Sequence, residues 1–410
     1  MLDTLNVRKD FPILNRTLEN NKKLIYFDNA ATSLKPKSVI EAINNYYLNY
    51  PANVHRGNHK LSQKASIIYE EVHNKVANFV NCKNNEVIFT LNSTDAINEV
   101  MYSLYNSNYF KKDDEIIVSL AEHHANLVPW QYLSKKLGLI LKFINIKDDF
   151  TLDLEDFKNK ITNKTKLVCV SHISNTLGTI NPIKDICKIT HNYGSLMLVD
   201  CSQSAPHLKI DFKELDVDFI AFTAHKMLGP TGIGCLIAKE ELLNKLEPFR
   251  FGGDMISNVT TTNSTWNRLP LKFEAGTPNI AGAFGLSAAI DYINNIGLDN
   301  IYNKDKELLK YAIEKLDPID NLSIYNIKDY NKQAPILLLD LKGVDCRIFS
   351  TILDEEENIA TRAGVHCAQP IINKYTKEGF TRVSFYFYNT FEEIDVLEKT
   401  IKKIDDKLSK

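Results

Sequence analysis

The fold is best read from the stretch Asp218-Phe-Ile-Ala-Phe-Thr-Ala-His-Lys-Met-Leu-Gly-Pro-Thr-Gly-Ile-Gly234, near the middle of the chain. Its apolar residues 219–222 predict a buried strand, and the glycines and proline that follow predict a turn. Between them come Thr223, His225 and Lys226. A lysine directly after a buried strand lies where its amine can be desolvated, so that its pKa falls and it can form a Schiff base. The alternative is an ordinary surface lysine at the end of a strand.

On both sides of this stretch, apolar segments typical of strands alternate with amphipathic segments typical of helices. The predicted strands end at residues 27, 91, 120, 146, 170 and 199. This alternation predicts an α/β fold with a mainly parallel sheet. Ligands bind such sheets beyond the carboxyl ends of the strands, where Asn175, Asp200 and Lys226 fall. A carboxylate that closes an apolar strand needs a cation, such as a protonated heterocyclic nitrogen, and a structural salt bridge is the alternative for Asp200.

Three polar groups beside predicted strands are candidates for ligand binding. Residues 92–95, Asn-Ser-Thr-Asp, follow a strand and open a helix, whose N-terminus favours a phosphate; a cap without a ligand is the alternative. His55 and Arg56 lie in a loop and could bind an anion or be solvated loop charges. Glu122, His123 and His124 have no metal-ligand spacing, so no metal site is expected, and a histidine there would face a ligand crevice.

The pattern changes after residue 240. We predict loops at 251–255, 257–267, 273–279 and 360–370, strands at 336–341 and 381–388, and helices at 282–296, 305–316, 345–355 and 391–408. At 410 residues the chain exceeds one typical domain. We therefore expect a large domain over 23–295 and a small one formed by 1–22 and 296–410.

Composition excludes several classes of protein. The chain is 44% apolar and 24% charged with a net charge of -2, which gives no sign of a nucleic-acid or anionic-membrane surface. The first ten residues lack the apolar core of a signal peptide, and no apolar run could span a bilayer. Seven scattered cysteines without a C-x-x-C argue against a disulfide framework or structural zinc. A cytoplasmic protein is expected, and an organellar protein without its presequence is the alternative.

Five motifs occur together in a recognisable order. They are Val54-His-Arg-Gly57, Glu122-His-His-Ala-Asn-Leu-Val-Pro-Trp130, His225-Lys-Met-Leu-Gly-Pro-Thr-Gly-Ile-Gly234, Phe273-Glu-Ala-Gly-Thr-Pro-Asn279 and Arg362-Ala-Gly-Val-His-Cys-Ala-Gln-Pro370. With these motifs the chain resembles the fold-type I pyridoxal-phosphate enzymes of class V, and among them the group II (SufS-type) cysteine desulfurases. The resemblance implies pyridoxal 5'-phosphate as cofactor, a large domain with a mainly parallel mixed sheet, and a smaller α+β C-terminal domain.

The resemblance also implies a role for each matching residue. Lys226 would hold the cofactor covalently and move the Cα proton, and Asp200 would keep the pyridinium nitrogen protonated, which makes the ring an electron sink. His123 would stack on the ring and assist proton transfers, and Gln203 would bond the ring's phenolic oxygen. The phosphate would be held by Ser93, Thr94, Thr223 and His225, with Thr277 from the second subunit of a homodimer. The substrate would be bound by Asn175, which also borders the cofactor, and by Arg382, Arg362, His55 and Arg56.

Cys367 would be the nucleophile. Its thiolate would attack the sulfur of bound L-cysteine, leaving L-alanine and a persulfide whose sulfur passes to a SufE- or SufU-type acceptor for iron–sulfur cluster assembly. The chain departs from the family at Val365, where a histidine is usual. An uncharged valine gives less help in lowering the pKa of the Cys367 thiol, while His366 remains. The alternatives are a selenocysteine lyase, another class V enzyme (an aminotransferase or kynureninase-like hydrolase), or a non-catalytic partner in sulfur transfer.

Overall fold

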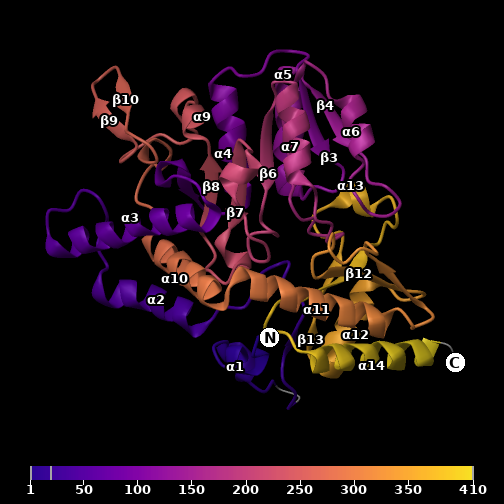
Figure 1. Ribbon diagram of the computed structural model, residues 1–410. Helices are drawn as coiled ribbons and strands as arrows, with labels where there is room; N and C mark the ends of the chain where they lie inside the picture. Colours follow the sequence, from indigo (N-terminus) through magenta and orange to yellow (C-terminus); the bar gives the residue numbers. More distant parts are fainter. Residues whose placement is uncertain (1, 19–20, 409–410) are drawn as a thin grey trace.

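The computed structural model describes residues 2–18 and 21–408 and is built on a seven-stranded sheet (Figure 1). The strands are β2 (Val87–Thr90), β3 (Glu115–Ser119), β4 (Ile140–Ile144), β5 (Thr165–Ser171), β6 (Leu196–Asp200), β7 (Phe219–Thr223) and β8 (Gly234–Ala238). Their spatial order is β2-β8-β7-β6-β5-β3-β4, and β8 runs antiparallel to both of its neighbours. The predicted α/β fold with a mainly parallel sheet is thereby confirmed.

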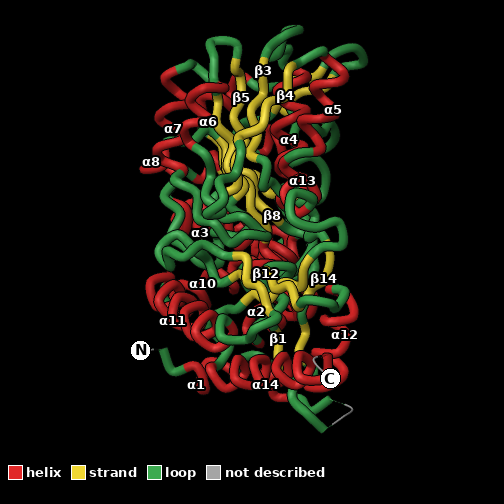
Figure 2. The backbone as a smooth tube through the Cα atoms, turned by 90° about the vertical axis from the view of Figure 1, so that its right-hand side faces the viewer, coloured by secondary structure: helices red, strands yellow, loops and turns green. Residues whose placement is uncertain are grey.

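Helices cover both faces of this sheet, as Figure 2 shows. Phe219 of β7 packs in the same core as α4 (Ser93–Asn106) and α5 (Val128–Leu137). Ile220, the next residue, packs in the opposite core. The helices that contribute to that opposite core include α3 (Lys60–Val80), α6 (Leu154–Lys160), α7 (Ile183–Asn192) and α10 (Ile280–Ile296). Burial on both faces explains why β7 is a continuous apolar run rather than an alternating one.

A second, four-stranded antiparallel sheet follows in the C-terminal part. Its strands are β11 (Leu322–Tyr325), β12 (Ile336–Leu341), β15 (Phe380–Ser384) and β14 (Arg362–Gly364), in that order. It shares a core with α11 (Leu298–Leu316), α12 (Cys346–Glu357) and α14 (Phe391–Leu408). Within the described residues, no helix combines the length and apolar character needed to cross a membrane.

The start of the chain lies against its end. β1 (Ile25–Tyr26) pairs in parallel with β13 (Ile359–Ala360), and α1 (Thr4–Arg8) lies beside α14 at the bottom of Figure 1. Another N-terminal helix, α2 (Lys37–Asn49), packs on α10. The proposed domain limits stay a prediction.

Several predicted boundaries and loops were wrong. Residues 257–267 contain a hairpin of β9 (Ile256–Val259) and β10 (Ser264–Trp266) rather than a loop, and 360–370 contain β14 and the short helix α13 (Gln369–Ile372). The hairpin is polar, so it has no apolar alternation to reveal it. The strand predicted to end at residue 388 ends at 384, because residues 385–388 are apolar through burial rather than through strand pairing.

Gly379 packs closely against Gly364, the last residue of strand β14, which leads to Cys367. Its φ is +98°, and a Cβ there would lie 2.3 Å from the carbonyl carbon of Gly364. Gly343 has a similar φ of +84° but open space around it. We expect Gly379→Ala to lower the free energy of unfolding by roughly 3 kcal/mol or more, and Gly343→Ala by about 1 kcal/mol. Urea denaturation measures both, and equal losses would show that the contact with β14 does not matter.

Candidate active site

The predicted site residues meet at one edge of the large sheet. Asp200 ends β6, Thr223 ends β7, and Lys226 closes the single 3-10 turn that follows β7. Asn175 lies just beyond the end of β5. β5, β6 and β7 are parallel neighbours, so the structure brings their carboxyl ends together as predicted. Asp200 is buried, and its Oδ1 accepts hydrogen bonds from the amide (2.9 Å) and hydroxyl (2.5 Å) of Ser202.

The amine of Lys226 is electrostatically prepared to react. Burial lowers its pKa to about 8, helped by the positive charges of Arg382 and Arg362 and opposed by the carboxylate of Asp200. An amine with this pKa is partly neutral at physiological pH, and the neutral form is the nucleophile towards a carbonyl group.

A phosphate fits the end of β7 and the start of α4. Thr90 of β2 and Thr223 of β7 both pair with Gly234, so the turn from β2 into α4 lies close to Thr223. A Cβ on Gly234 would lie 2.7 Å from the backbone of Asn92, which caps α4. The hydroxyl of Thr223 is buried without a hydrogen-bond partner among the described residues. This hydroxyl is free to bind a ligand, and a helix N-terminus favours an anionic one.

Three side chains expected beside the cofactor are neutral, those of His123, Gln203 and His225. The Nδ1 of His123 accepts a hydrogen bond from the amide of Ala125 (3.0 Å), so Nε2 carries the proton. Burial and the nearby Lys226 lower the pKa of His123 to about 4, and the same causes lower that of His225 to about 4. Gln203 is buried and donates through Nε2 to the carbonyl of Ala30 (2.7 Å).

Glu122, beside His123, is enclosed by hydrogen-bond donors. One carboxylate oxygen accepts from the hydroxyl of Ser119 (2.5 Å) and the amide of Ser171 (2.9 Å). The other accepts from Asn126 (2.7 Å). The side chain is therefore a structural anchor for this loop.

Arg382 and Asn175, the expected carboxylate ligands, are in direct contact. Arg382 is 1% exposed and donates through Nη1 to the backbone carbonyl of Asn175 (2.9 Å). Its Nη2 donates to Asp28 (3.1 Å), while its Nε is buried without a partner in the described part of the chain. Asn175 donates through Nδ2 to the carbonyl of His366 (2.8 Å). The unpartnered Nε–H leaves Arg382 able to bind an anion.

Cys367 faces the same site and is held firmly. Its Sγ lies 3.6 Å from Nη2 of Arg362, and its carbonyl accepts a hydrogen bond from the amide of His124 (2.7 Å). The Cys367 thiol also acts electrostatically on Lys226 and Arg382. Both Cys367 and the residue before it have a positive φ, +57° and +50°. The nucleophile expected from the sequence is thus close to the expected lysine.

His366, the histidine that remains in the motif, has a neutral ring. Its Nε2 lies 2.9 Å from the carbonyl of Phe380, which can only accept, so Nε2 carries a proton. Burial lowers the pKa of the ring to about 3, and the ring is neutral. The charged group in contact with the thiol is Arg362.

The remaining predicted residues lie in the loop before α3, in the loop after Phe273 and at the start of α4. Arg56 pairs with Asp254 (2.7 Å), and the ring of His55 packs edge-on against Tyr69. Thr277 is exposed in the loop after Phe273, beside a cavity of about 110 Å³. Of the two residues that open α4, Ser93 is half-buried and Thr94 is exposed.

Sequence analysis assigned no part in the site to residues 28–35, which follow the first predicted strand. Asp28 bonds Arg382, and Ala30 bonds Gln203. The carbonyl of His225, which precedes Lys226, accepts hydrogen bonds from the amide of Ser33 (3.1 Å), the hydroxyl of Thr32 (2.9 Å) and the amine of Lys35 (2.7 Å). No local pattern reveals these contacts, because the partners are 170 or more residues away.

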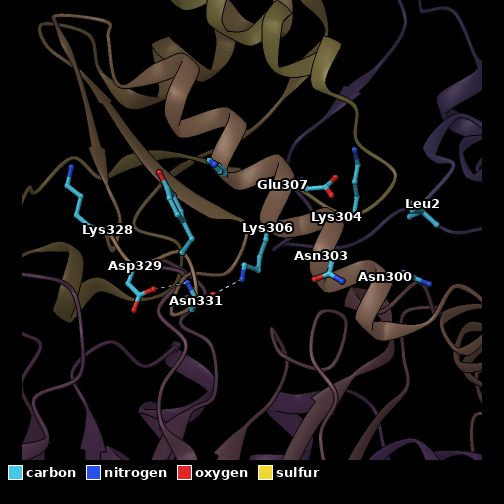
Figure 3. Close-up of a pocket in the computed structure, with 11 residues that line it drawn as sticks. Leu2, Asn300, Asn303, Lys304, Lys306, Glu307, Lys328, Asp329 and Asn331 are labelled. Carbon is cyan, nitrogen blue, oxygen red and sulfur yellow. Dashed lines mark hydrogen bonds between the residues drawn. The ribbon is translucent and has the colours of Figure 1, made fainter.

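One cavity lies outside this site. It has a volume of about 690 Å³ and lies between α11 and residues 328–331 (Figure 3). Its lining is mostly lysine and asparagine, and Lys306 donates to Asn331 (2.6 Å) across it. None of the predicted site residues lines it. The chemistry of the side chains, rather than cavity size, therefore locates the candidate site.

The comparisons with known proteins agree with this geometry. The sequence pattern of the family described as aminotransferase class-V matches residues 25–397. A probable cysteine desulfurase of Halalkalibacterium halodurans is 45% identical over 97% of each chain. The solved structure of a cysteine desulfurase from Thermococcus onnurineus has a TM-score of 0.94 at 41% identity, covering 99% of each chain. That of a cysteine desulfurase from Escherichia coli has a TM-score of 0.90 at 33% identity, covering 100% of this chain and 99% of its own. The chain belongs to the class-V aminotransferase family.

Proposed function

We propose that the protein is a cysteine desulfurase that uses pyridoxal 5'-phosphate to convert L-cysteine to L-alanine. The observation that carries this proposal is the placement of Cys367, beside Arg362, at the same site as Lys226. An aminotransferase or a kynureninase-like hydrolase would need the lysine but would have no use for the cysteine. The names of the relatives, 41–46% identical over nearly the whole chain, support the same reaction.

Residues of this chain would bind each part of the cofactor. Thr223 and the N-terminus of α4 would hold the phosphate, Asp200 would pair with the ring nitrogen, and Lys226 would form the covalent link. When bound, the cofactor supplies an electron sink for the substrate's Cα. The roles of Gln203 and His225 next to it rest on the family resemblance.

The chain's own groups would move the protons and the sulfur. Lys226, with a pKa of about 8, can take the proton from Cα and return one. His123, with its proton on Nε2, can donate to the substrate. The Cys367 thiolate would attack the substrate sulfur, so that an S–S bond forms as the Cβ–S bond breaks. L-cysteine and the Cys367 thiol thus give L-alanine and the Cys367 persulfide, with all atoms balanced.

The direct test is incubation of the purified protein with L-cysteine, followed by assay of alanine and sulfide. Equal amounts of alanine and total released plus protein-bound sulfur are expected. Alanine formation without any sulfur on Cys367 or in solution would contradict the proposal, as would the absence of both products.

Sulfur delivery follows from how tightly Cys367 is held. β14 ends three residues before it, its carbonyl bonds His124, and α13 begins two residues after it. We propose a group II enzyme whose persulfide is collected inside the site by a small acceptor of the SufE or SufU type, for iron–sulfur cluster assembly. Alanine formation is expected to be slow alone, strongly accelerated by such an acceptor, and poorly accelerated by dithiothreitol. Turnover that is fast alone and indifferent to acceptors would contradict this.

Quaternary structure and cellular place are part of the same proposal. Phe251 is 58% exposed, and the loop that carries Thr277 is exposed, as expected of segments that complete a neighbouring site. We propose a homodimer in which Thr277 acts at the partner's site. Sedimentation showing a fully active monomer would contradict it. All seven cysteines are free, which supports a place in the cytoplasm.

A further inference from the structure

Asp28 is a carboxylate that the proposed mechanism does not use, yet it lies at the predicted substrate ligand. Its Oδ1 is 3.1 Å from Nη2 of Arg382. The Arg382 side chain is 1% exposed and that of Asp28 is 23% exposed, so Asp28 forms the solvent-side partner of a buried cation. The backbone is fixed there by a parallel bridge between Asp28 and Ser384.

Burial disfavours the charged form of Asp28, and the nearby cations favour it. Burial raises its pKa, whereas Arg382, Arg362 and Lys226 lower it. Burial also lowers the pKa of Arg382, and Asp28 opposes that change. Each member of the pair thus stabilises the charge on the other, and Asp28 stands among the three cations that an anionic substrate would meet.

Two of the three side-chain nitrogens of Arg382 have protein partners, and the third has none in the described residues. Nη1 is committed to the backbone carbonyl of Asn175, which cannot turn away. Nη2 is used by Asp28, and the buried Nε has no partner in the described residues. A carboxylate binds arginine best through two parallel N–H groups, such as Nε–H and an Nη–H. Nη2 carries two N–H groups, of which Asp28 uses one, so a carboxylate bound to Nε–H and the second Nη2–H would lie directly beside the carboxylate of Asp28.

We infer that Asp28 is a positioning residue that holds Arg382 ready and competes with the α-carboxylate of the amino acid for it, which limits the affinity of the site for substrate and product. The inference deepens the proposed function and rests on it for the identity of the amino acid. A like charge beside the bound carboxylate weakens binding. L-alanine carries the same carboxylate as L-cysteine, so the re-formed Asp28–Arg382 pair would also favour product release.

Asp28→Asn separates charge from hydrogen bonding, because asparagine keeps a carbonyl oxygen for Nη2 of Arg382. The probe is propionate, which is alanine without its amino group, and propionamide is its uncharged counterpart. In the cofactor-loaded protein, calorimetry is expected to show a dissociation constant for propionate about tenfold lower in the variant. Binding of propionamide should not change. The KM for L-cysteine should fall as well, with kcat unchanged or lower because alanine leaves more slowly.

Asp395→Asn is the matched control. Asp395 pairs with Lys315 at the same distance, 3.1 Å, and its side chain is 32% exposed, but it lies on α14. This variant should bind propionate as the wild type does. Unchanged or weaker propionate binding in Asp28→Asn would overturn the inference. A wild type that forms no alanine from cysteine would instead refute the proposed function, whatever the propionate result.

Discussion

Replacing Cys367 with alanine is expected to lower sulfide and persulfide formation from L-cysteine by roughly 10³-fold or more. Sulfur is a poor leaving group from carbon unless a nucleophile accepts it, and Cys367 is the thiol at the site of Lys226. Selenium leaves more readily, so the same variant should keep much of its activity towards L-selenocysteine. The measurement is alanine formation from each amino acid under the same conditions.

Cys82→Ala is the matched control for this experiment. Cys82 is a free cysteine that is half-buried like Cys367, but it lies just after α3. It should retain both activities. Equal loss of the cysteine and selenocysteine reactions in Cys367→Ala would show that Cys367 supports the structure or the proton transfers rather than accepting sulfur.

Lys226→Ala is expected to reduce alanine formation by about 10⁴-fold or more and to abolish the covalent attachment of pyridoxal phosphate. The wild type should be yellow, and reduction with borohydride should fix the cofactor on the peptide that contains Lys226. The variant should give no such modified peptide, although the cofactor can still bind without a covalent link through Thr223 and the start of α4.

A second lysine makes this test discriminating. Burial lowers the pKa of Lys35 to about 8, the same value as for Lys226, and Lys35 bonds the carbonyl of His225 next to Lys226. A low pKa alone would let either lysine react. Lys35→Met should keep the yellow colour and the modified Lys226 peptide. Modification of Lys35, or a colourless wild type that takes up no added cofactor, would contradict the assignment.

The parts of the fold that were predictable carry their signal in local periodicity. The buried strand β7 is marked by an unbroken apolar run, and α14 by an amphipathic pattern whose predicted limits, 391–408, match the structure. The polar hairpin β9–β10 lacks the apolar alternation from which strands are predicted. β14 is only three residues long. It is a strand because it pairs with β15, and its own sequence is too short to show a strand pattern.

In the candidate site, too, features that depend on residues distant in the sequence could not be predicted from local patterns. Lys226 and Cys367 lie in recognisable motifs, and strand ends position Lys226 and Asp200, so the sequence alone named these three candidates. The neutrality of His366 could not be predicted, because it depends on burial and on the positive charges of Arg382 and Arg362, which only the folded chain brings to the ring. The competition of Asp28 for Arg382 depends on a partner 354 positions distant, and no reading of local sequence contains that pairing.

The contacts of residues 28–35 also set when the site can exist during synthesis. Asn29 donates to Ser384 and Asn389, and the hydroxyl of Tyr388 donates to Asn29 and accepts from the amide of Leu34. Every one of these partners lies within residues 384–389. The large sheet is complete at Ala238 and can form on the nascent chain, but the candidate site must wait until residue 389 has left the ribosome. Chains that terminate between these two points would therefore fold in part and remain inert.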